Sequence, residues 1–241
     1  MPDIAVNEHP LGPEPVKLTV SDFLLLKRAG VFAGYSKSEL LDGRLWGVRA
    51  QADDERESDA VHPIKLRIED YLRLSEGGAF ERYVKTEIID GLVYAMNPQH
   101  RPHGFAKDEL AYRLRRALEA MRSDLHVATE QSVAMIPNDQ PEPDIILTTE
   151  PRGPGAIPGA AVALLVEVAD TSLDHDLLRK ARVYADQGLA EYWVVDVKAG
   201  LIHQMWSPQG EVYAAGREVK LGERIEAATI EGLAVETDGI N

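Results

Sequence analysis

The chain has 241 residues, with 26 lysines and arginines against 40 aspartates and glutamates, so its formal net charge is −14. It contains no cysteine, which excludes a disulfide framework and any cysteine-based zinc site or nucleophile. The acidic balance argues against loose binding to nucleic acid. Because no long apolar run or signal-like N-terminus occurs, we expect a soluble cytoplasmic protein without a membrane span.

An internal repeat occupies the N-terminal part of the chain. Residues 18–48 align without gaps onto residues 66–96, and such self-similarity is typical of a duplicated structural unit. Each copy predicts a short helix, a loop and a hairpin that turns at Asp-Gly, a strong two-residue turn signal. Identical pairs include Asp22/Asp70, Gly30/Gly78, Phe32/Phe80, Tyr35/Tyr83, Lys37/Lys85, Glu39/Glu87, Asp42/Asp90 and Gly43/Gly91.

A solvated linker over residues 51–60 separates the two copies, because this stretch is acidic and nearly free of bulky apolar side chains. We therefore predict an N-terminal duplicated helix-hairpin unit with its acidic linker, residues 1–60, and a main domain, residues 61–241. A unit of this size cannot supply a core alone. We expect residues 18–48 to dock on the main domain or on the same region of a second chain, in a homodimer.

The remaining elements follow in a regular order. Apolar residues at helical spacing from Ala106 to Met121 predict a helix, and the segment Arg101 to Arg122 is the one clearly basic part of the chain. A second helix, at about 173–187, should end at Gly188, a usual helix stop. Around these helices we expect strands at about 126–136, 143–148, 161–168 and 192–197, then a closing hairpin at about 200–206 and 212–214. The order predicts an α/β (α+β) fold.

A lone carboxylate, Glu167, lies within the apolar run Val162 to Val168. An ionised and unpaired carboxylate in a buried strand is costly, so a metal ion, a cation or a shifted pKa must compensate it. A second acid, Asp144, opens the apolar run Ile145 to Leu147. Two strand-borne acids favour a metal site.

A lysine, Lys180, follows Glu167 on the segment that is predicted to form the second helix. Lys180 has Asp176 and Tyr184 one turn to either side. Together with the two acids, this lysine predicts a metal-dependent phosphodiesterase site.

These motifs resemble the Uma-type restriction endonucleases of the PD-(D/E)XK nuclease superfamily. The resemblance runs from about residue 66 to 214. It rests on Pro143-Asp144, Glu167-Val-Ala-Asp-Thr-Ser-Leu, Asp176-x3-Lys180-x3-Tyr184-Ala and Gly188-Leu-Ala-Glu-Tyr-Trp-Val-Val-Asp196, with Glu87-Ile-Ile-Asp-Gly91, His103 and Gln131 upstream. It implies a restriction-endonuclease-like core, with a mixed central sheet flanked by helices.

The resemblance also implies an activity. Asp144, Glu167 and Glu87 would be the metal ligands for Mg²⁺ or Mn²⁺, because oxygen ligands suit these ions. Position 169 holds alanine where the superfamily signature has lysine, so Lys180 is the candidate catalytic lysine. With His103 as a substrate contact, the chain is interpreted as a metal-dependent DNA endonuclease.

Each of these residues also has a structural interpretation. Asp144 could cap a strand, Glu167 could pair with an arginine, and Lys180 could be an exposed partner of Asp176. His103 could start a helix, and Glu87 could be a solvated strand residue.

Two other functional classes remain open. One is a catalytically silent nuclease-fold protein that binds nucleic acid or a protein partner. The other is a metal-dependent hydrolase of a small phosphorylated molecule. Glu39 repeats Glu87, but no equivalent of His103 and the basic helix follows it. The first copy is therefore not expected to form a second active site.

Overall fold

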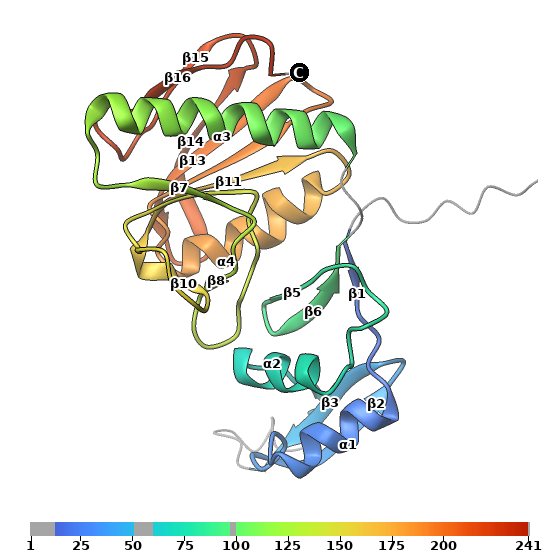
Figure 1. Cartoon of the computed structure of the whole chain (residues 1–241). Coiled ribbons are helices and arrows are strands. Elements are labelled where there is room, and N and C mark those ends of the chain that lie inside the picture. The colour runs from blue at the N-terminus through green and yellow to red at the C-terminus, as the bar shows by residue number, and fades with distance from the viewer. Residues whose placement is uncertain (1–12, 51–59, 97–99, 241) are drawn as a thin grey trace, which may run out of the picture. The chain divides into compact units, whose positions relative to one another are not determined.

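The structure is a computed structural model, and it describes residues 13–50, 60–96 and 100–240. These residues form two compact units (Figure 1). We call them the large unit, with residues 13–14, 100–133 and 142–240, and the duplicated unit, with residues 15–50, 60–96 and 134–141. Among the described helices, none combines the length and the apolar character needed to cross a membrane.

A six-stranded mixed sheet forms the centre of the large unit. From edge to edge its strands are β14 (Val212–Lys220), β13 (Leu201–Gln209), β12 (Glu191–Asp196), β11 (Val162–Ala169), β9 (Ile145–Thr148) and β7 (His126–Thr129). Only β11 and β12 are parallel; the other neighbouring pairs are antiparallel. Parallel neighbours need a crossover connection, and a helix supplies it here.

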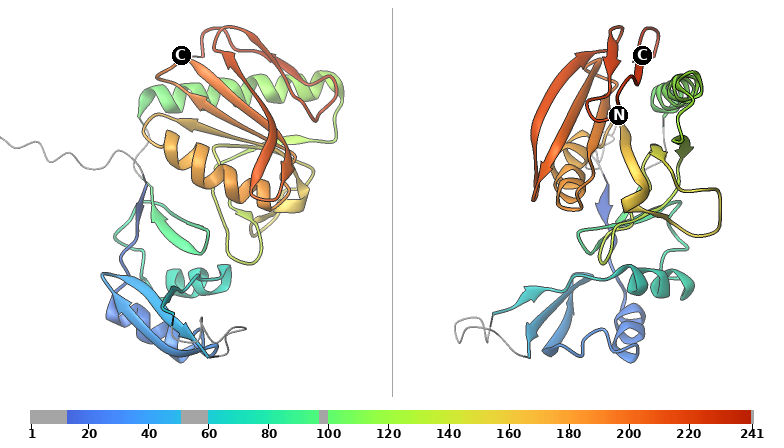
Figure 2. Two further views of the ribbon diagram at one scale, coloured as in Figure 1. Left: turned by 180° about the vertical axis from the view of Figure 1, so that it is seen from behind. Right: turned by 90° about the vertical axis from the view of Figure 1, so that its left-hand side faces the viewer.

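Helices cover both faces of this sheet (Figure 2). One face packs against α3 (Arg101–Met121), because Val166 and Val168 of β11 share a core with residues of that helix. The crossover between β11 and β12 consists of a π-helical segment, η2 (His175–Lys180), followed by α4 (Ala181–Asp186). It lies on the other face, since strand side chains alternate and α4 contacts Glu167. The predicted mixed sheet flanked by helices is confirmed.

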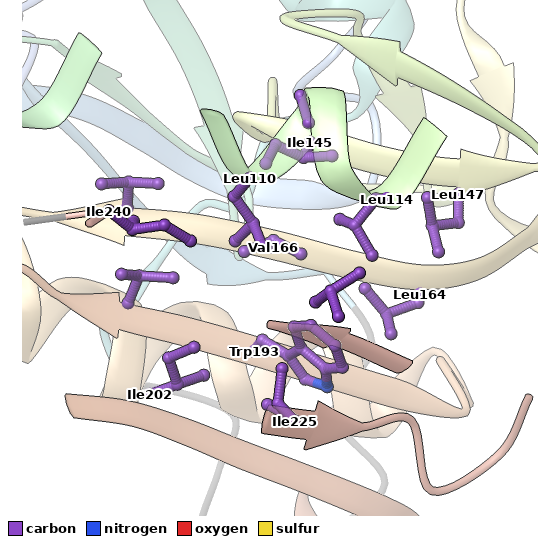
Figure 3. Close-up of a cluster of buried hydrophobic side chains, with 14 of the residues drawn as sticks. Leu110, Leu114, Ile145, Leu147, Leu164, Val166, Trp193, Ile202, Ile225 and Ile240 are labelled. Atoms are coloured by element: carbon purple, nitrogen blue, oxygen red, sulfur yellow. The ribbon is translucent and has the colours of Figure 1, made fainter. Parts of the chain in front are cut away.

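The core beneath α3 is one continuous apolar cluster. Figure 3 shows side chains of α3 beside those of the central strands, among them Leu110, Leu114, Leu164, Val166 and Trp193. A short sheet of β15 (Arg224–Glu226) and β16 (Ala234–Glu236) closes this core, with Ile225 and Ile240 fully buried. Full burial of one such side chain contributes about 1.5–3 kcal/mol.

A buried carboxylate ties the C-terminal segment to the sheet. Oε1 of Glu191 accepts hydrogen bonds from Trp193 Nε1 at 2.6 Å, Gln204 Nε2 at 2.6 Å and the Ala228 amide at 3.0 Å. Oε2 accepts from the amide and the hydroxyl of Thr229, both at 2.8 Å. Charge-assisted hydrogen bonds of this kind offset the desolvation of the carboxylate. Glu191 therefore has a structural role, which the sequence did not reveal.

The elements of the large unit differ from the predicted ones in two places. The strand expected at about 126–136 is divided into β7 and β8 (Val133–Ala134), because Glu130 adopts a left-handed backbone conformation with φ of 51°. The helix expected at about 173–187 begins with the wider π turn of η2. Two further short elements, β10 (Ile157–Pro158) and the 3-10 turn η1 (Gly159–Ala161), precede β11.

The two repeat copies fold alike. α1 (Val20–Arg28) and α2 (Ile68–Glu76) begin and end at equivalent residues of the repeat. The hairpin of the first copy is β2 (Tyr35–Leu41) with β3 (Arg44–Arg49), and that of the second is β5 (Thr86–Ile89) with β6 (Leu92–Ala95). Asp42 and Asp90 have φ of 47° and 52°, as the predicted Asp-Gly turns require. The predicted duplication is confirmed.

Each copy receives a strand from the segment that precedes the other. β1 (Glu14–Pro15) precedes the first copy but pairs with β6, and β4 (His62–Pro63) precedes the second copy but pairs with β3. The exchange is reciprocal, since Val16 N–H donates to Val93 O at 2.8 Å and Ile64 N–H donates to Leu45 O at 2.9 Å. The duplicated unit is thus an internal dimer with pseudo-twofold symmetry.

Both copies contribute to one core. Leu26 of the first and Leu74 of the second are fully buried in the same cluster. The first copy therefore docks on the second within one chain, which was one of the two predicted arrangements. The boundary between the two compact units does not fall at residue 60, because both repeat copies lie in the duplicated unit. That residues 61–241 form a domain on their own stays a prediction.

Deletion of residues 1–60 should expose the apolar surface of the second copy, because it removes β1 and the whole first copy from this core. We expect a lower soluble yield and larger particles by light scattering. A deletion of residues 1–12, which leaves every described element in place, is the matched control. Equal solubility of both fragments would contradict the shared core.

Candidate active site

The strand register brings Asp144 and Glu167 together in the large unit. β9 and β11 run antiparallel, with Ile146 opposite Leu165 and Ile145 opposite Val166. The next step of this ladder places Asp144 opposite Glu167, and residues directly opposite each other share one face of a sheet. Both side chains are buried, at 5% and 4% exposure.

Two side chains of the crossover helix hold Glu167. Its Oε1 accepts hydrogen bonds from Lys180 Nζ and from the Tyr184 hydroxyl, both at 3.0 Å. Lys180 is only 1% exposed, so this ion pair is buried. The spacing of four residues along the helix puts Lys180 and Tyr184 on one face, which lets both reach the same oxygen. The compensating cation that Glu167 requires is thus Lys180.

A third carboxylate, that of Asp176, also lies near Lys180. Asp176 Oδ1 is 3.8 Å from Lys180 Nζ, and Asp176 Oδ2 accepts a hydrogen bond from Ser172 Oγ at 2.5 Å. Asp176 and Lys180 are the buried residues of η2, and π-helical turns are frequent at functional sites. The alternative interpretation of Lys180 as an exposed partner of Asp176 is therefore wrong, because both side chains are buried.

Tyr192, from β12, also contacts the segment that carries Asp176 and Lys180. The Tyr192 hydroxyl donates to the Asp176 carbonyl at 3.2 Å. Burial raises the pKa of Tyr192 well above its ordinary value, and the negative charges of Asp176 and Glu167 raise it further. The hydroxyl therefore stays protonated at neutral pH and acts as a donor.

Asp144 accepts hydrogen bonds from two different elements. Its Oδ2 lies 3.2 Å from His103 Nε2, on the first turn of α3, and accepts from the Val168 amide at 2.8 Å. Burial by itself raises the pKa of Asp144, but His103, the Val168 amide and the charge of Lys180 together lower that pKa below its ordinary value. Asp144 is therefore ionised at neutral pH.

These carboxylates fit a hard divalent cation held by few protein ligands. Within the part of the chain that the structure describes, no group of three or more histidines and acids is placed to hold a metal ion. Mg²⁺ is nonetheless commonly bound through one or two carboxylates, with water and substrate phosphate as further ligands. The adjacent Asp144 and Glu167 meet that need. Glu87 is buried on β5 of the duplicated unit, so its predicted role as a ligand stays a prediction.

The structure thus brings together four sequence-predicted residues: Asp144, Glu167, Lys180 and His103. Tyr184 was not among the predicted site residues; it is fully buried, and its hydroxyl contacts Glu167. The four-residue spacing from Lys180 was the signal that could have identified it. No comparable signal links His103 to Asp144, because only tertiary packing brings α3 to the end of β9.

The chain matches the model of the Uma2 family, described as "Putative restriction endonuclease", over residues 68–237. Its fold is similar to the crystal structure of a putative nuclease belonging to DUF820 from Anabaena variabilis ATCC 29413. The TM-score is 0.50 at 12% sequence identity, over 68% of this chain and 95% of the other. No curated protein matches the chain. Family and fold together support a nuclease. Because the family model spans more than half of the sequence, the chain belongs to the Uma2 family of putative restriction endonucleases.

Proposed function

We propose that this protein is a metal-dependent DNA endonuclease that hydrolyses phosphodiester bonds. The observation that carries the proposal is the buried group of Asp144, Glu167 and Lys180, in which two adjacent strand-borne carboxylates lie beside one cation. Membership of the Uma2 family and the nuclease-like fold support the same class. Asp144 and Glu167 would hold Mg²⁺ or Mn²⁺.

The protein side chains prepare this site for a cation. Asp144 is already ionised at neutral pH, so binding requires no proton loss there. The hydrogen bonds from Lys180 and Tyr184 fix the orientation of Glu167. When bound, the metal would lower the pKa of a water molecule and neutralise charge on the phosphate.

Lys180 is the proposed catalytic cation. It comes from the crossover helix, whereas Ala169, at the position where the superfamily has lysine, is a buried apolar residue. Its ammonium lies between Glu167 and Asp176 in a site that excludes most water. There it can orient the attacking water or stabilise charge that develops on the phosphate oxygens, and both effects are strong at low dielectric.

A DNA substrate is supported by α3 rather than by the whole chain. Segment 101–122 carries six lysines and arginines against three acids, although the net charge of the protein is −14. Local charge decides attraction at a site. His103 lies on the first turn of this helix, where its Nε2 is 3.2 Å from Asp144 Oδ2. We propose His103 as the contact to the substrate.

Incubation of supercoiled and linear DNA with Mg²⁺, Mn²⁺ or EDTA tests the proposal, and we expect cleavage only with a metal. Absence of site-specific metal binding by calorimetry would instead indicate a silent nuclease-fold binding protein. DNA binding that does not weaken with salt, together with hydrolysis of small phosphate esters, would indicate a small-molecule hydrolase. The cytoplasmic location also remains a prediction, which cell fractionation would test.

Asp144→Asn and Glu167→Gln should each abolish metal binding and cleavage while the protein stays folded, because each removes one of two anionic ligands. Calorimetry with Mn²⁺, a plasmid-cleavage assay and circular dichroism would measure the three properties. Glu191→Gln is the matched control, since Glu191 is a buried carboxylate on the opposite face of the sheet. The control should lose stability but keep metal-dependent cleavage. Full activity in both site variants would refute the assignment.

Lys180→Met should lower turnover about 100-fold or more, which is typical for loss of a donor that stabilises transition-state charge. Metal affinity should change less than about tenfold, because both carboxylates remain. Single-turnover cleavage and calorimetry separate the two effects. The control is Lys107→Met, which removes the other buried lysine, a partner of Glu130. Wild-type turnover in Lys180→Met would leave Lys180 with a structural role only.

The lowered pKa of Asp144 makes stability depend on pH. An acid with a lowered folded pKa stabilises the fold above its ordinary value of 3.8, and this contribution is lost as the pH falls through the folded pKa. We expect the free energy of unfolding of wild type to exceed that of Asp144→Asn at about pH 6. The difference should narrow from about pH 4 to about pH 2 in urea titrations. In a His103→Ala background, this difference in the free energy of unfolding should be smaller. A difference that does not change with pH would contradict the interaction between His103 and Asp144.

A further inference from the structure

One edge of the second repeat copy is covered by the segment 134–141 of the same unit. Gln140 N–H donates to Ile88 O at 2.8 Å, which extends the sheet β1-β6-β5 beyond its edge strand β5. Gly91 N–H donates to Asn138 O at 3.2 Å, and Asn138 Nδ2 donates to Leu66 O at 2.7 Å. This short extended segment therefore binds the hairpin through its backbone and through an asparagine amide.

The same segment also satisfies two further amides. Ile68 N–H, at the start of α2, donates to Pro137 O at 2.9 Å. Asp90 N–H, in the hairpin turn, donates to the carboxylate of Asp139. Four consecutive residues, 137–140, thus bind a helix start, a turn and a strand edge at once.

The first copy has the equivalent surface, and no described segment covers it in the same way. The counterparts of the bound groups are the N–H groups of Val20, Asp42 and Gly43 and the carbonyls of Leu18 and Leu40. In residues 13–50, 60–96 and 100–240, no hydrogen-bond partner occupies these positions. β2 is accordingly an edge strand of the sheet β2-β3-β4. An edge of this kind is a template for pairing with another segment.

The apolar side chains on this edge also lack cover. Leu41 is 53% exposed, whereas its counterpart Ile89 is 0% exposed, and Val20 is 67% exposed where Ile68 is half-buried. A free strand edge flanked by exposed apolar side chains is the usual site for addition of an extended peptide strand.

The chain carries a second sequence of the type that binds this surface. Residues 7–10 are Asn-Glu-His-Pro, and residues 138–141 are Asn-Asp-Gln-Pro. Both place an asparagine amide first, an acid second, a residue with a backbone N–H third and a proline last. Residues 7–10 lie outside the described residues, so the comparison rests on sequence and on the geometry of segment 134–141.

We propose that this edge of the first copy binds residues 7–10 of a second copy of the chain, and that reciprocal binding forms a dimer. Asn7 would donate to the Leu18 carbonyl, Glu8 would accept from the Asp42 amide, and His9 N–H would donate to the Leu40 carbonyl. Two such contacts related by twofold symmetry reinforce each other.

The direction of the segment favours a second chain over the same chain. Segment 134–141 passes the turn first and then follows β5 away from the turn. If residues 7–10 of the same chain bound the first copy in this direction, they would lead away from the Asp42-Gly43 turn. The chain would then have to reverse between Pro10 and Glu14, because Leu18 lies beside Gly43 in that turn. Pro10, Pro13 and Pro15 favour extended backbone, which makes so short a reversal unfavourable.

Size-exclusion chromatography with light scattering over a range of protein concentrations tests this dimer. We expect the full chain to reach twice its monomer mass as concentration rises, and a deletion of residues 2–12 to stay monomeric at the same concentrations. An excess of a synthetic peptide of residues 1–13 should dissociate the full-length dimer. The double variant Asn7→Ala/Glu8→Ala should raise the dissociation constant about tenfold or more.

The surface itself is tested with a matched pair of variants. Leu41→Ser should weaken the dimer, whereas Val61→Ser should not, although both residues are 53% exposed in the same unit. A full-length chain that is monomeric at every concentration would overturn the proposal. A dimer that survives the deletion would exclude residues 7–10 as the occupant, and equal behaviour of the two serine variants would exclude this edge.

Discussion

The buried ion pair of Lys180 and Glu167 is the interaction on which the candidate active site depends. Two charges removed from water cost several kcal/mol each, and their attraction offsets this only with good geometry and further hydrogen bonds. Here Tyr184 supplies a second donor to the same oxygen, and Asp176 flanks the ammonium. A well-packed apolar pair would stabilise the fold at least as well. The ion pair therefore indicates chemistry rather than stability, and it fixes the crossover helix against β11.

The site was predictable wherever local sequence pattern decides the placement. An acid inside an apolar strand has few options, so Glu167 required a partner, and the helix that must follow a parallel strand brought Lys180 within reach. The position of Asp144 depends on strand register, which the apolar runs also specify. The pairing of His103 with Asp144 was not predictable, because it depends on how α3 packs on the sheet. Glu191 was missed for the same reason, since its donors come from β13 and from the C-terminal segment.

The duplicated unit shows a different limit of sequence patterns. Turn chemistry and the repeat offset predicted both hairpins and both helices, because these are local features. The exchange of β1 and β4 between the copies was not visible, since a two-residue strand carries no signal for its partner. The exchange stabilises both copies. Each hairpin gains a third strand, and neither copy could bury its apolar residues alone.

Glu39 and Glu87 show why a repeated residue does not imply a repeated function. They occupy equivalent positions in the hairpins of the two copies. The side chain of Glu39 is nevertheless 35% exposed and pairs with Lys37 at 3.0 Å, whereas Glu87 is 1% exposed. An exposed ion pair contributes little and perturbs its members little. A buried carboxylate is costly and must be compensated, so it is the one suited to a ligand role. The environment of each copy, rather than the identity of the residue, therefore separates a structural glutamate from a candidate ligand.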